Sequence, residues 1–113
     1  MDRLITYRTL LKDLLNQHAE RIKQFPQPNI EVEVNFDEER DHYMLLRLGW
    51  TPKGRLFAPA LYARLRNQKI WIENDWTDQG LATELLEHGV PPEDVVLAFH
   101  PPEMRVHTEF AIA

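Results

Sequence analysis

A chain of 113 residues is long enough for one domain with a single core, and its 43% apolar and 27% charged residues are typical of a folded globular protein. Thirteen Lys and Arg residues against eighteen Asp and Glu give a net charge of -5, which argues against direct binding to the phosphate backbone of nucleic acids. The chain has no cysteine, so disulfides and thiolate zinc sites are excluded.

The first predicted element is a long amphipathic helix over residues 3–24. Asp2 is a suitable N-cap, and Pro26 cannot continue the helix. His18 falls within the apolar stripe, and we interpret it as part of the packed face rather than as a ligand. The stripe follows the three-four spacing of one helix face and contains Leu4, Tyr7, Leu11, Leu14, Ile22 and Phe25.

Two strands of alternating polarity come next. Ile30, Val32, Val34 and Phe36 alternate with polar residues, and Met44, Leu46, Leu48 and Trp50 repeat the period. We expect the two runs to pair as an antiparallel hairpin with both apolar sets on one face. The first helix should then lie on the Ile30, Val32 and Val34 side of that hairpin.

The connection from Asp37 to His42 holds the densest cluster of ionisable groups. It is typical of a hairpin loop in which Asp37 and Asp41 accept backbone N–H bonds. The alternative is a metal-dependent nuclease or other hydrolase that uses this loop with His100, His107 and Glu109. Because adjacent loop acids point in different directions and the histidines lack metal-ligand spacing, we assign no catalytic, cofactor or metal residues.

Residues 55–66 and 69–74 predict a third and a fourth strand. Pro59 has no N–H to donate, so we expect an edge position or a bulge there, with residues 58–61 as a candidate contact surface. Trp71 alternates with Ile70 and Ile72, so both faces of the sheet carry large apolar groups. One face takes the first helix, and the other needs a second helix or a second subunit.

A second, shorter helix is predicted after Thr77, its expected N-cap, with Trp76 and Leu81 forming a hydrophobic staple. Gly89 fits the left-handed position after the helix, with Val90 folding back in a Schellman motif. His88 is placed to stabilise the last carbonyl groups.

Two apolar segments end the chain. Residues 95–99 form a buried strand or a short core helix, which periodicity does not distinguish, and residues 106–113 should dock on the sheet or pair with another protein. Together the elements predict one α+β domain over residues 1–113. A long N-terminal helix packs on a mainly antiparallel, meander-like sheet of four or more strands, with a second, shorter helix and a C-terminal strand.

Several phrases along the chain resemble one family, the fdxN element excision controlling factor (XisI-like) proteins, known mainly from cyanobacteria. The resemblance runs from Tyr7 to the end of the chain. The phrases are Phe36-Asp37 with Asp41-His42-Tyr43, Gly49-Trp50, Lys69-Ile70-Trp71-Ile72, Gly89-Val90-Pro91, Glu93-Asp94-Val95-Val96-Leu97 and Thr108-Glu109-Phe110-Ala111.

The resemblance implies a compact α+β protein that acts in programmed DNA excision, where a separate recombinase cuts and rejoins the DNA. An endonuclease-like companion family, XisH-like, commonly accompanies this one. We therefore expect a non-enzymatic accessory factor that binds this companion, without cofactors and without sequence-specific DNA binding of its own.

The acidic surface around the first strand and the following loop is the candidate partner-binding site, because it can present phosphate-like charge to a basic cleft. Its residues are Glu31, Glu33, Asp37, Glu38, Glu39 and Asp41. We also expect a homo-oligomer, formed through the sheet face that bears Trp71 or the strand edge near Pro59. No apolar run reaches membrane-spanning length, so a cytoplasmic location is expected.

Overall fold

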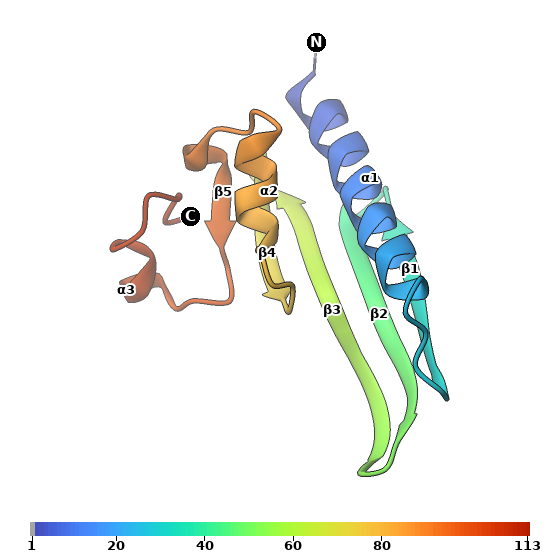
Figure 1. The fold of residues 1–113 in the computed structure, drawn as a ribbon. Coiled ribbons are helices and arrows are strands. Elements are labelled where there is room, and N and C mark those ends of the chain that lie inside the picture. Colours follow the sequence, from blue (N-terminus) through green and yellow to red (C-terminus); the bar gives the residue numbers. More distant parts are fainter. Residues whose placement is uncertain (1) are drawn as a thin grey trace.

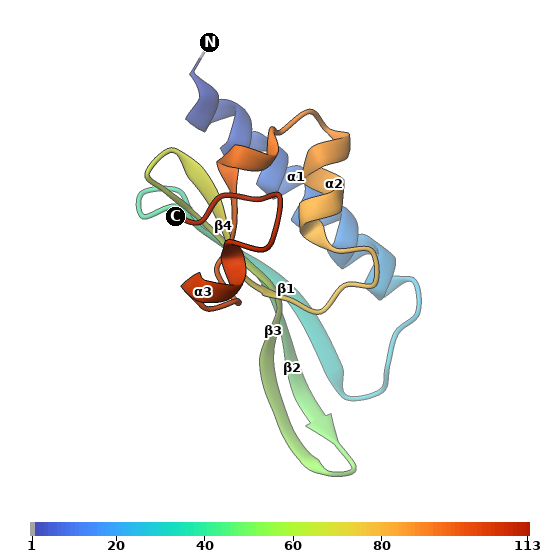
Figure 2. The same ribbon diagram turned by 90° about the vertical axis from the view of Figure 1, so that its left-hand side faces the viewer.

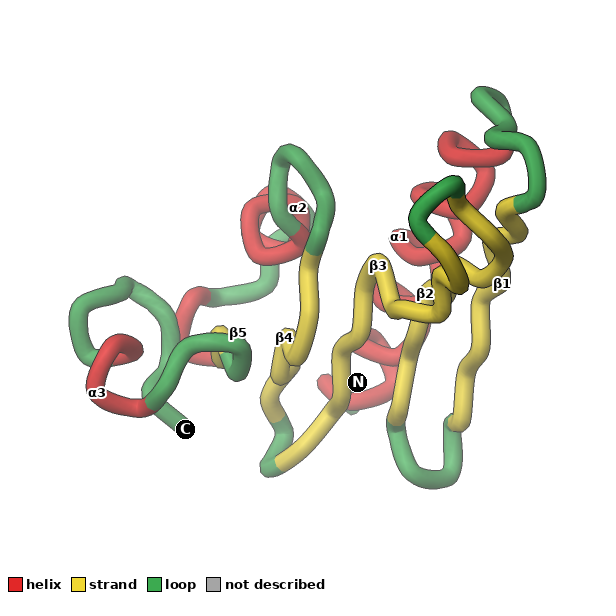
Figure 3. The backbone as a smooth tube through the Cα atoms, turned by 90° about the horizontal axis from the view of Figure 1, so that it is seen from below, coloured by secondary structure: helices red, strands yellow, loops and turns green. Residues whose placement is uncertain are grey.

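One five-stranded sheet organises the computed structural model, which describes residues 2–113 (Figure 1). The elements are α1 (Arg3–Lys23), β1 (Ile30–Asp37), β2 (His42–Thr51), β3 (Gly54–Arg66), β4 (Lys69–Asp75), α2 (Leu81–Glu87), a 3-10 turn (Pro92–Asp94), β5 (Val95–Leu97) and α3 (Pro102–Arg105). The strands lie in chain order, β1 to β4 antiparallel and β5 parallel to β4 (Figure 3). The predicted α+β class is confirmed.

Both longer helices lie on the same side of the sheet, α1 over β1 to β3 and α2 over β4 and β5 (Figures 1 and 3). We call this side the inner face. α1 begins where predicted, since the Asp2 carboxylate accepts a 2.9 Å hydrogen bond from the backbone N–H of Leu4. Its buried stripe includes Leu11, Leu15 and His18, which is 7% exposed. Within residues 2–113, no helix has the length and apolarity needed to span a membrane.

The register between β1 and β2 differs from the expected one. Val34 lies opposite Leu45 and Phe36 opposite Tyr43, so Tyr43 and Leu45, both fully buried, share the inner face with the apolar residues of β1. Residues directly opposite each other on two paired strands point to the same side of the sheet. The four residues between Asp37 and His42 set this register, and with it the odd-numbered residues of β2 face α1. The prediction that both apolar sets share one face was therefore wrong.

The even-numbered side chains of β2 project from the opposite side, which we call the outer face. Here Met44, Leu46 and Leu48 are half-buried, and Glu33 and Glu31 lie opposite the latter two. Of the apolar residues of β1, Val34 is still 36% exposed, because α1 covers this edge strand only in part. The N-terminal helix thus packs on the predicted side of β1 but buries chiefly β2 and β3 beneath it.

Pro59 lies in the part of β3 that pairs with β2 but precedes the pairing with β4. The ladder between β2 and β3 shifts by one residue at this point, where Leu45 pairs with Leu61 and Leu46 with Pro59. The bulge confirms one of the two expectations for Pro59, and the pairing of β4 with residues 61–66 alone places Pro59 beside a strand edge as well. It also reverses the faces along β3, because Leu61 is buried whereas Phe57 is 69% exposed on the outer face.

Arginine side chains and the C-terminal segment cover the side of β4 that bears Trp71. The guanidinium groups of Arg66 and Arg105 lie 5.2 and 5.7 Å from the centre of the indole ring, which leaves Trp71 8% exposed. Arg105 belongs to α3, and the following segment docks through a parallel bridge between Ala111 and Val96. The chain end therefore supplies the cover itself, beside β5 (Figure 2).

The second helix starts later than predicted. Gly80 is its N-cap, and Oδ2 of Asp75 accepts the N–H of Leu81 at 2.6 Å. Thr77 instead donates to Asp75, and Trp76 is 72% exposed, so no hydrophobic staple forms. The predicted Schellman ending is confirmed, because Val90 N–H donates to Leu85 O and Gly89 N–H to Leu86 O, both at 3.0 Å. His88 also contacts a terminal carbonyl, that of Glu84, as predicted.

Candidate functional site

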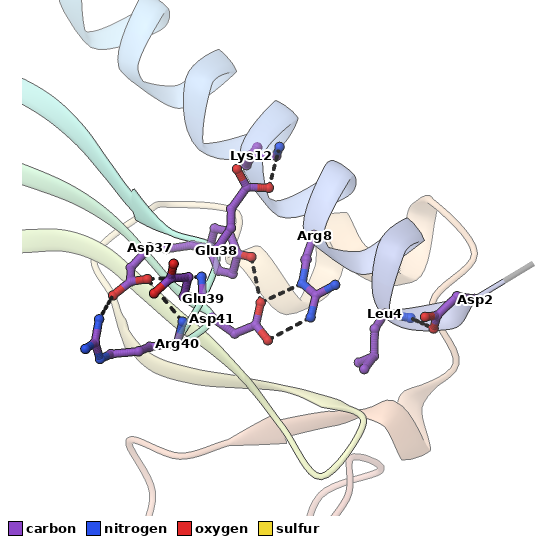
Figure 4. A network of polar contacts seen from close by, with 10 residues as sticks. Asp2, Leu4, Arg8, Lys12, Asp37, Glu38, Glu39, Arg40 and Asp41 are labelled. Carbon is purple, nitrogen blue, oxygen red and sulfur yellow. Dashed lines mark hydrogen bonds and ion pairs between the residues drawn. The ribbon is translucent and has the colours of Figure 1, made fainter.

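The six carboxylates of the predicted acidic surface fall into two groups. Glu31 and Glu33 project from the outer face of β1, whereas the other four belong to the end of β1 and the turn that follows (Figure 4). At about 3.3 Å per residue along a strand, Glu31 lies roughly 20 Å from Asp37. The six residues line one edge of the sheet and do not converge on a point.

Asp37 organises the turn between β1 and β2, as the loop interpretation predicts. Its Oδ1 accepts hydrogen bonds from the backbone N–H groups of Glu39 and Arg40, both at 3.1 Å, and its Oδ2 accepts one from the Arg40 side chain at 3.2 Å. These bonds favour the ionised carboxylate, so that the backbone and side chain of Arg40 lower the pKa of Asp37. This residue has a structural task within its own turn.

Asp41 connects the turn to the first helix. Arg8 of α1 donates two hydrogen bonds to the carboxylate, from Nε at 2.7 Å and Nη2 at 3.1 Å (Figure 4). The hydroxyl of the buried Tyr43 donates a third at 2.8 Å. Hydrogen bonding by Arg8 lowers the pKa of Asp41, while burial and the neighbouring carboxylate raise that of Tyr43. Glu38 is also engaged, because Lys12 lies 2.9 Å from it.

Three carboxylates of the predicted surface, Glu31, Glu33 and Glu39, stay exposed and form no ion pair with any described residue. The other three bind Arg8, Lys12 or Arg40 of the same chain. Sequence proximity could not reveal this division, since Arg8 is 33 residues away from Asp41. The acidity that faces solvent is therefore concentrated at Glu31, Glu33 and Glu39.

The structure does not bring together the side chains of the metal-dependent alternative. Over residues 2–113, no group of three His, Cys, Asp or Glu side chains could hold a metal ion. Nδ1 of His42 lies 2.5 Å from the hydroxyl of Tyr62, on the outer face, and the loop carboxylates are bound to cations. His107 and Glu109 are exposed on the segment after α3.

An apolar patch borders the free carboxylates. Met44, Leu46 and Leu48 of β2 and the exposed Phe57 of β3 share the outer face of the hairpin, which extends beyond the ends of the other strands (Figures 1 and 2). Leu46 and Leu48 lie directly opposite Glu33 and Glu31. A row of unpaired carboxylates on β1 therefore lies beside apolar side chains of β2 and β3, a feature that the assumed register concealed.

Two buried polar contacts also escaped sequence reasoning. Nε2 of His18 lies 2.5 Å from Oε1 of Glu84, and both residues are less than 10% exposed. Asp94, 6% exposed, accepts a hydrogen bond from the hydroxyl of Tyr7. The sequence does contain a signal for these contacts, because polar residues occupy positions that the helix spacing assigns to the core. His18 lies in the apolar stripe of α1, and Glu84 lies between Leu81 and Leu85. Which of these polar residues form pairs depends on the tertiary fold.

Comparisons with known proteins agree over the whole chain. A family model described as XisI protein matches residues 1–112. The crystal structure of a XisI-like protein from Anabaena variabilis is 33% identical, with a TM-score of 0.89 over 97% of this chain and 99% of that one. The structure of the fdxN element excision controlling factor XisI from the same organism is 36% identical, with a TM-score of 0.85 over 99% and 100%. No curated protein matches significantly.

Proposed function

Because this chain belongs to the XisI family, we propose that it is a non-enzymatic accessory factor in the programmed excision of a DNA element. One similar protein is described as an excision controlling factor, which suggests regulation rather than catalysis. The factor acts by binding a protein partner, an endonuclease-like companion of the XisH type. It does so in the cytoplasm, where the DNA is accessible, and it does not read the DNA sequence itself.

The observation that carries this proposal is the outer face of the β2–β3 hairpin. Its apolar residues Met44, Leu46, Leu48 and Phe57 lie on the side opposite α1 and α2. A patch of this kind, rimmed by polar groups, is typical of a protein interaction site. The proposed companion buries these side chains.

The negative charge beside the apolar patch favours a partner with a basic surface. The net charge is -5, and the carboxylates of Glu31 and Glu33 border the apolar patch and form no ion pair with residues 2–113. An enzyme that binds DNA carries a basic cleft, so an acidic surface is complementary to it and speeds association at low salt. Glu39 at the adjoining turn extends this complementarity. Asp37, Glu38 and Asp41 position the turn and contribute little to binding.

Co-purification tests the proposal. The tagged protein and its XisH-like companion are co-expressed, and the complex is measured by size-exclusion chromatography at micromolar concentrations and about 50 mM salt, where charge steering is weakly screened. We expect a stable complex whose affinity falls as salt is raised. The absence of a complex under these conditions would contradict the proposal.

The metal-dependent nuclease gains no support from the geometry. Its loop carboxylates already bind Arg8, Lys12 and Arg40, and such an enzyme needs carboxylates that converge on one ion. We therefore do not propose it as a second function.

Self-association is a separate proposal. β4 pairs with residues 61–66 of β3, so residues 54–58 form a strand edge with no neighbour among the described residues. Such an edge can pair with the same segment of a second copy. We propose that this edge, close to the predicted Pro59 position, forms a homodimer. Light scattering that reports a monomer over a wide concentration range would contradict it.

A further inference from the structure

An arginine lies on the inner face of the sheet, where an apolar residue is expected. Arg47 of β2 stands in register with Val32 of β1 and Ala58 of β3, two residues after the fully buried Leu45. Side chains at this parity point toward α1. Arg47 is therefore held half-buried beneath the C-terminal half of the first helix.

The guanidinium group of Arg47 has no partner within residues 2–113. Its Nε is buried and makes no hydrogen bond, and none of the ion pairs in this part of the chain includes it. Folding removes water from Nε without replacing the lost hydrogen bond, which is unfavourable. A cation held in this way is ready to bind an anion from outside the chain.

Arg47 lines a cavity of about 430 Å³ between α1, the sheet and the segment before α2. Arg21 and His18 of α1 contribute to the same wall, and Trp76, 72% exposed, contributes a flat apolar surface. Asp78 is the one carboxylate among the residues that line the cavity, and two arginines share this lining with it. A volume of this size falls within the range of about 300 to 1,000 Å³ found for small-molecule sites.

The side chains of His18 and Arg21 already have a carboxylate beside them, which singles out Arg47. Glu84 lies 2.5 Å from His18 and 3.9 Å from Arg21, so this buried carboxylate serves the α1 side of the cavity. Among residues 2–113, no carboxylate forms an ion pair with Arg47 on the sheet side. The unmatched positive charge is thus at the floor of the cavity, and the indole of Trp76 is at its wall.

We propose that this cavity binds a small organic oxyanion, a carboxylate or phosphate attached to a planar apolar group. The fork of N–H groups on Arg47 donates hydrogen bonds to the two oxygens, Arg21 adds charge, and Trp76 stacks on the planar group. The site is distinct from the proposed companion surface, because Arg47 and Trp76 line the helix side of the sheet. A companion that fails to bind would leave this inference untouched.

Benzoate and phenyl phosphate are suitable probes, with neutral benzamide as the control for shape. Binding is followed by NMR through the Nε–H of Arg47 and the indole N–H of Trp76. We expect saturable shifts of both signals with at least one oxyanion below about 10 mM, the weak affinity typical of fragments, and none with benzamide. If neither oxyanion shifts them, or benzamide shifts them equally, the inference is wrong.

Substitution separates binding from folding. Arg47→Met keeps an unbranched apolar side chain at this position and removes the unpaired charge, so the ligand-free variant should melt at the wild-type temperature or above, while oxyanion affinity falls at least about tenfold. Arg21→Met, on the exposed side of α1, should weaken binding without unfolding the protein. Arg55→Met at the far end of the hairpin should bind like the wild type. Unchanged affinity in both Arg47→Met and Arg21→Met would overturn the assignment.

Discussion

The hydroxyl group of Tyr7 lies 2.5 Å from Oδ2 of Asp94, although 87 residues separate the two in the chain. Asp94 precedes β5, and Arg3 of α1 approaches the same oxygen at 3.3 Å. The first turns of the N-terminal helix are thereby tied to the last strand of the sheet. Burial, reinforced by this hydrogen bond to the carboxylate, raises the pKa of Tyr7 to about 12.

Tyr7→Phe should destabilise the fold by about 1 to 3 kcal/mol, because the buried carboxylate of Asp94 loses a donor. Urea denaturation measures this loss, and a double-mutant cycle with Asp94→Asn should show that the two changes are not additive. A raised pKa in the folded state means that this contribution is complete below the unfolded pKa of about 10 and is lost as pH rises through about 12. Additive changes would show that the two residues are not coupled.

The link between Asp41 and Arg8 predicts an acid-sensitive contribution to stability. Asp41→Asn keeps the left-handed backbone, φ 58°, but loses the charge, and should cost about 1 to 2 kcal/mol at pH 7. Because the folded-state pKa is lowered, the contribution of Asp41 is complete above about pH 4 and disappears as pH falls through the folded pKa. Thermal unfolding between pH 2 and 7 should show the two proteins converging in acid.

Glu39→Gln is the matched control for Asp41→Asn, since it removes one charge from an exposed residue of the same turn. Its melting temperature should follow that of the wild type at every pH. A constant gap between wild type and Asp41→Asn down to pH 2 would mean that the carboxylate charge is not what stabilises the turn.

Local signals in the sequence were sufficient to predict the helices and strands, but they were insufficient to predict which side of each strand is buried. Asp2 caps the start of α1, Pro26 follows its end, and Gly89 ends α2, so each of these signals acts within a few residues. Which side chains of β2 face α1 depends on the length of the connection from β1. The outward position of Phe57 depends on the bulge in β3, and alternating polarity does not show where that bulge lies. The acidic surface stays a prediction, and which of its carboxylates are free depends on Arg8 and Lys12 of α1 and on Arg40 of the turn.

The glycine of the family phrase Gly49-Trp50 is required for steric reasons. A Cβ atom there would lie 1.9 Å from the carbonyl oxygen of Asn29, which accepts a hydrogen bond from Trp50 N–H. Gly54 has a similar φ, 129° against 150°, yet nothing lies within 4 Å of its Cβ position. Gly54→Ala should cost about 1 to 2 kcal/mol from backbone strain, and Gly49→Ala at least about 1 to 2 kcal/mol more. Equal losses in urea denaturation would refute the close approach.

Charge reversal on β1 tests the companion surface most directly. Glu31→Lys with Glu33→Lys changes the charge beside Leu48 and Leu46 by four units and should weaken companion binding at least about tenfold, mainly by slowing association, because like charges then face each other. Asp13→Lys with Glu20→Lys makes the same change in net charge on the exposed side of α1 and should alter affinity little. Surface plasmon resonance at two salt concentrations separates the cases. If both double variants weaken binding equally, net charge rather than the outer face governs the encounter, and if neither does, the acidic rim has no part in it.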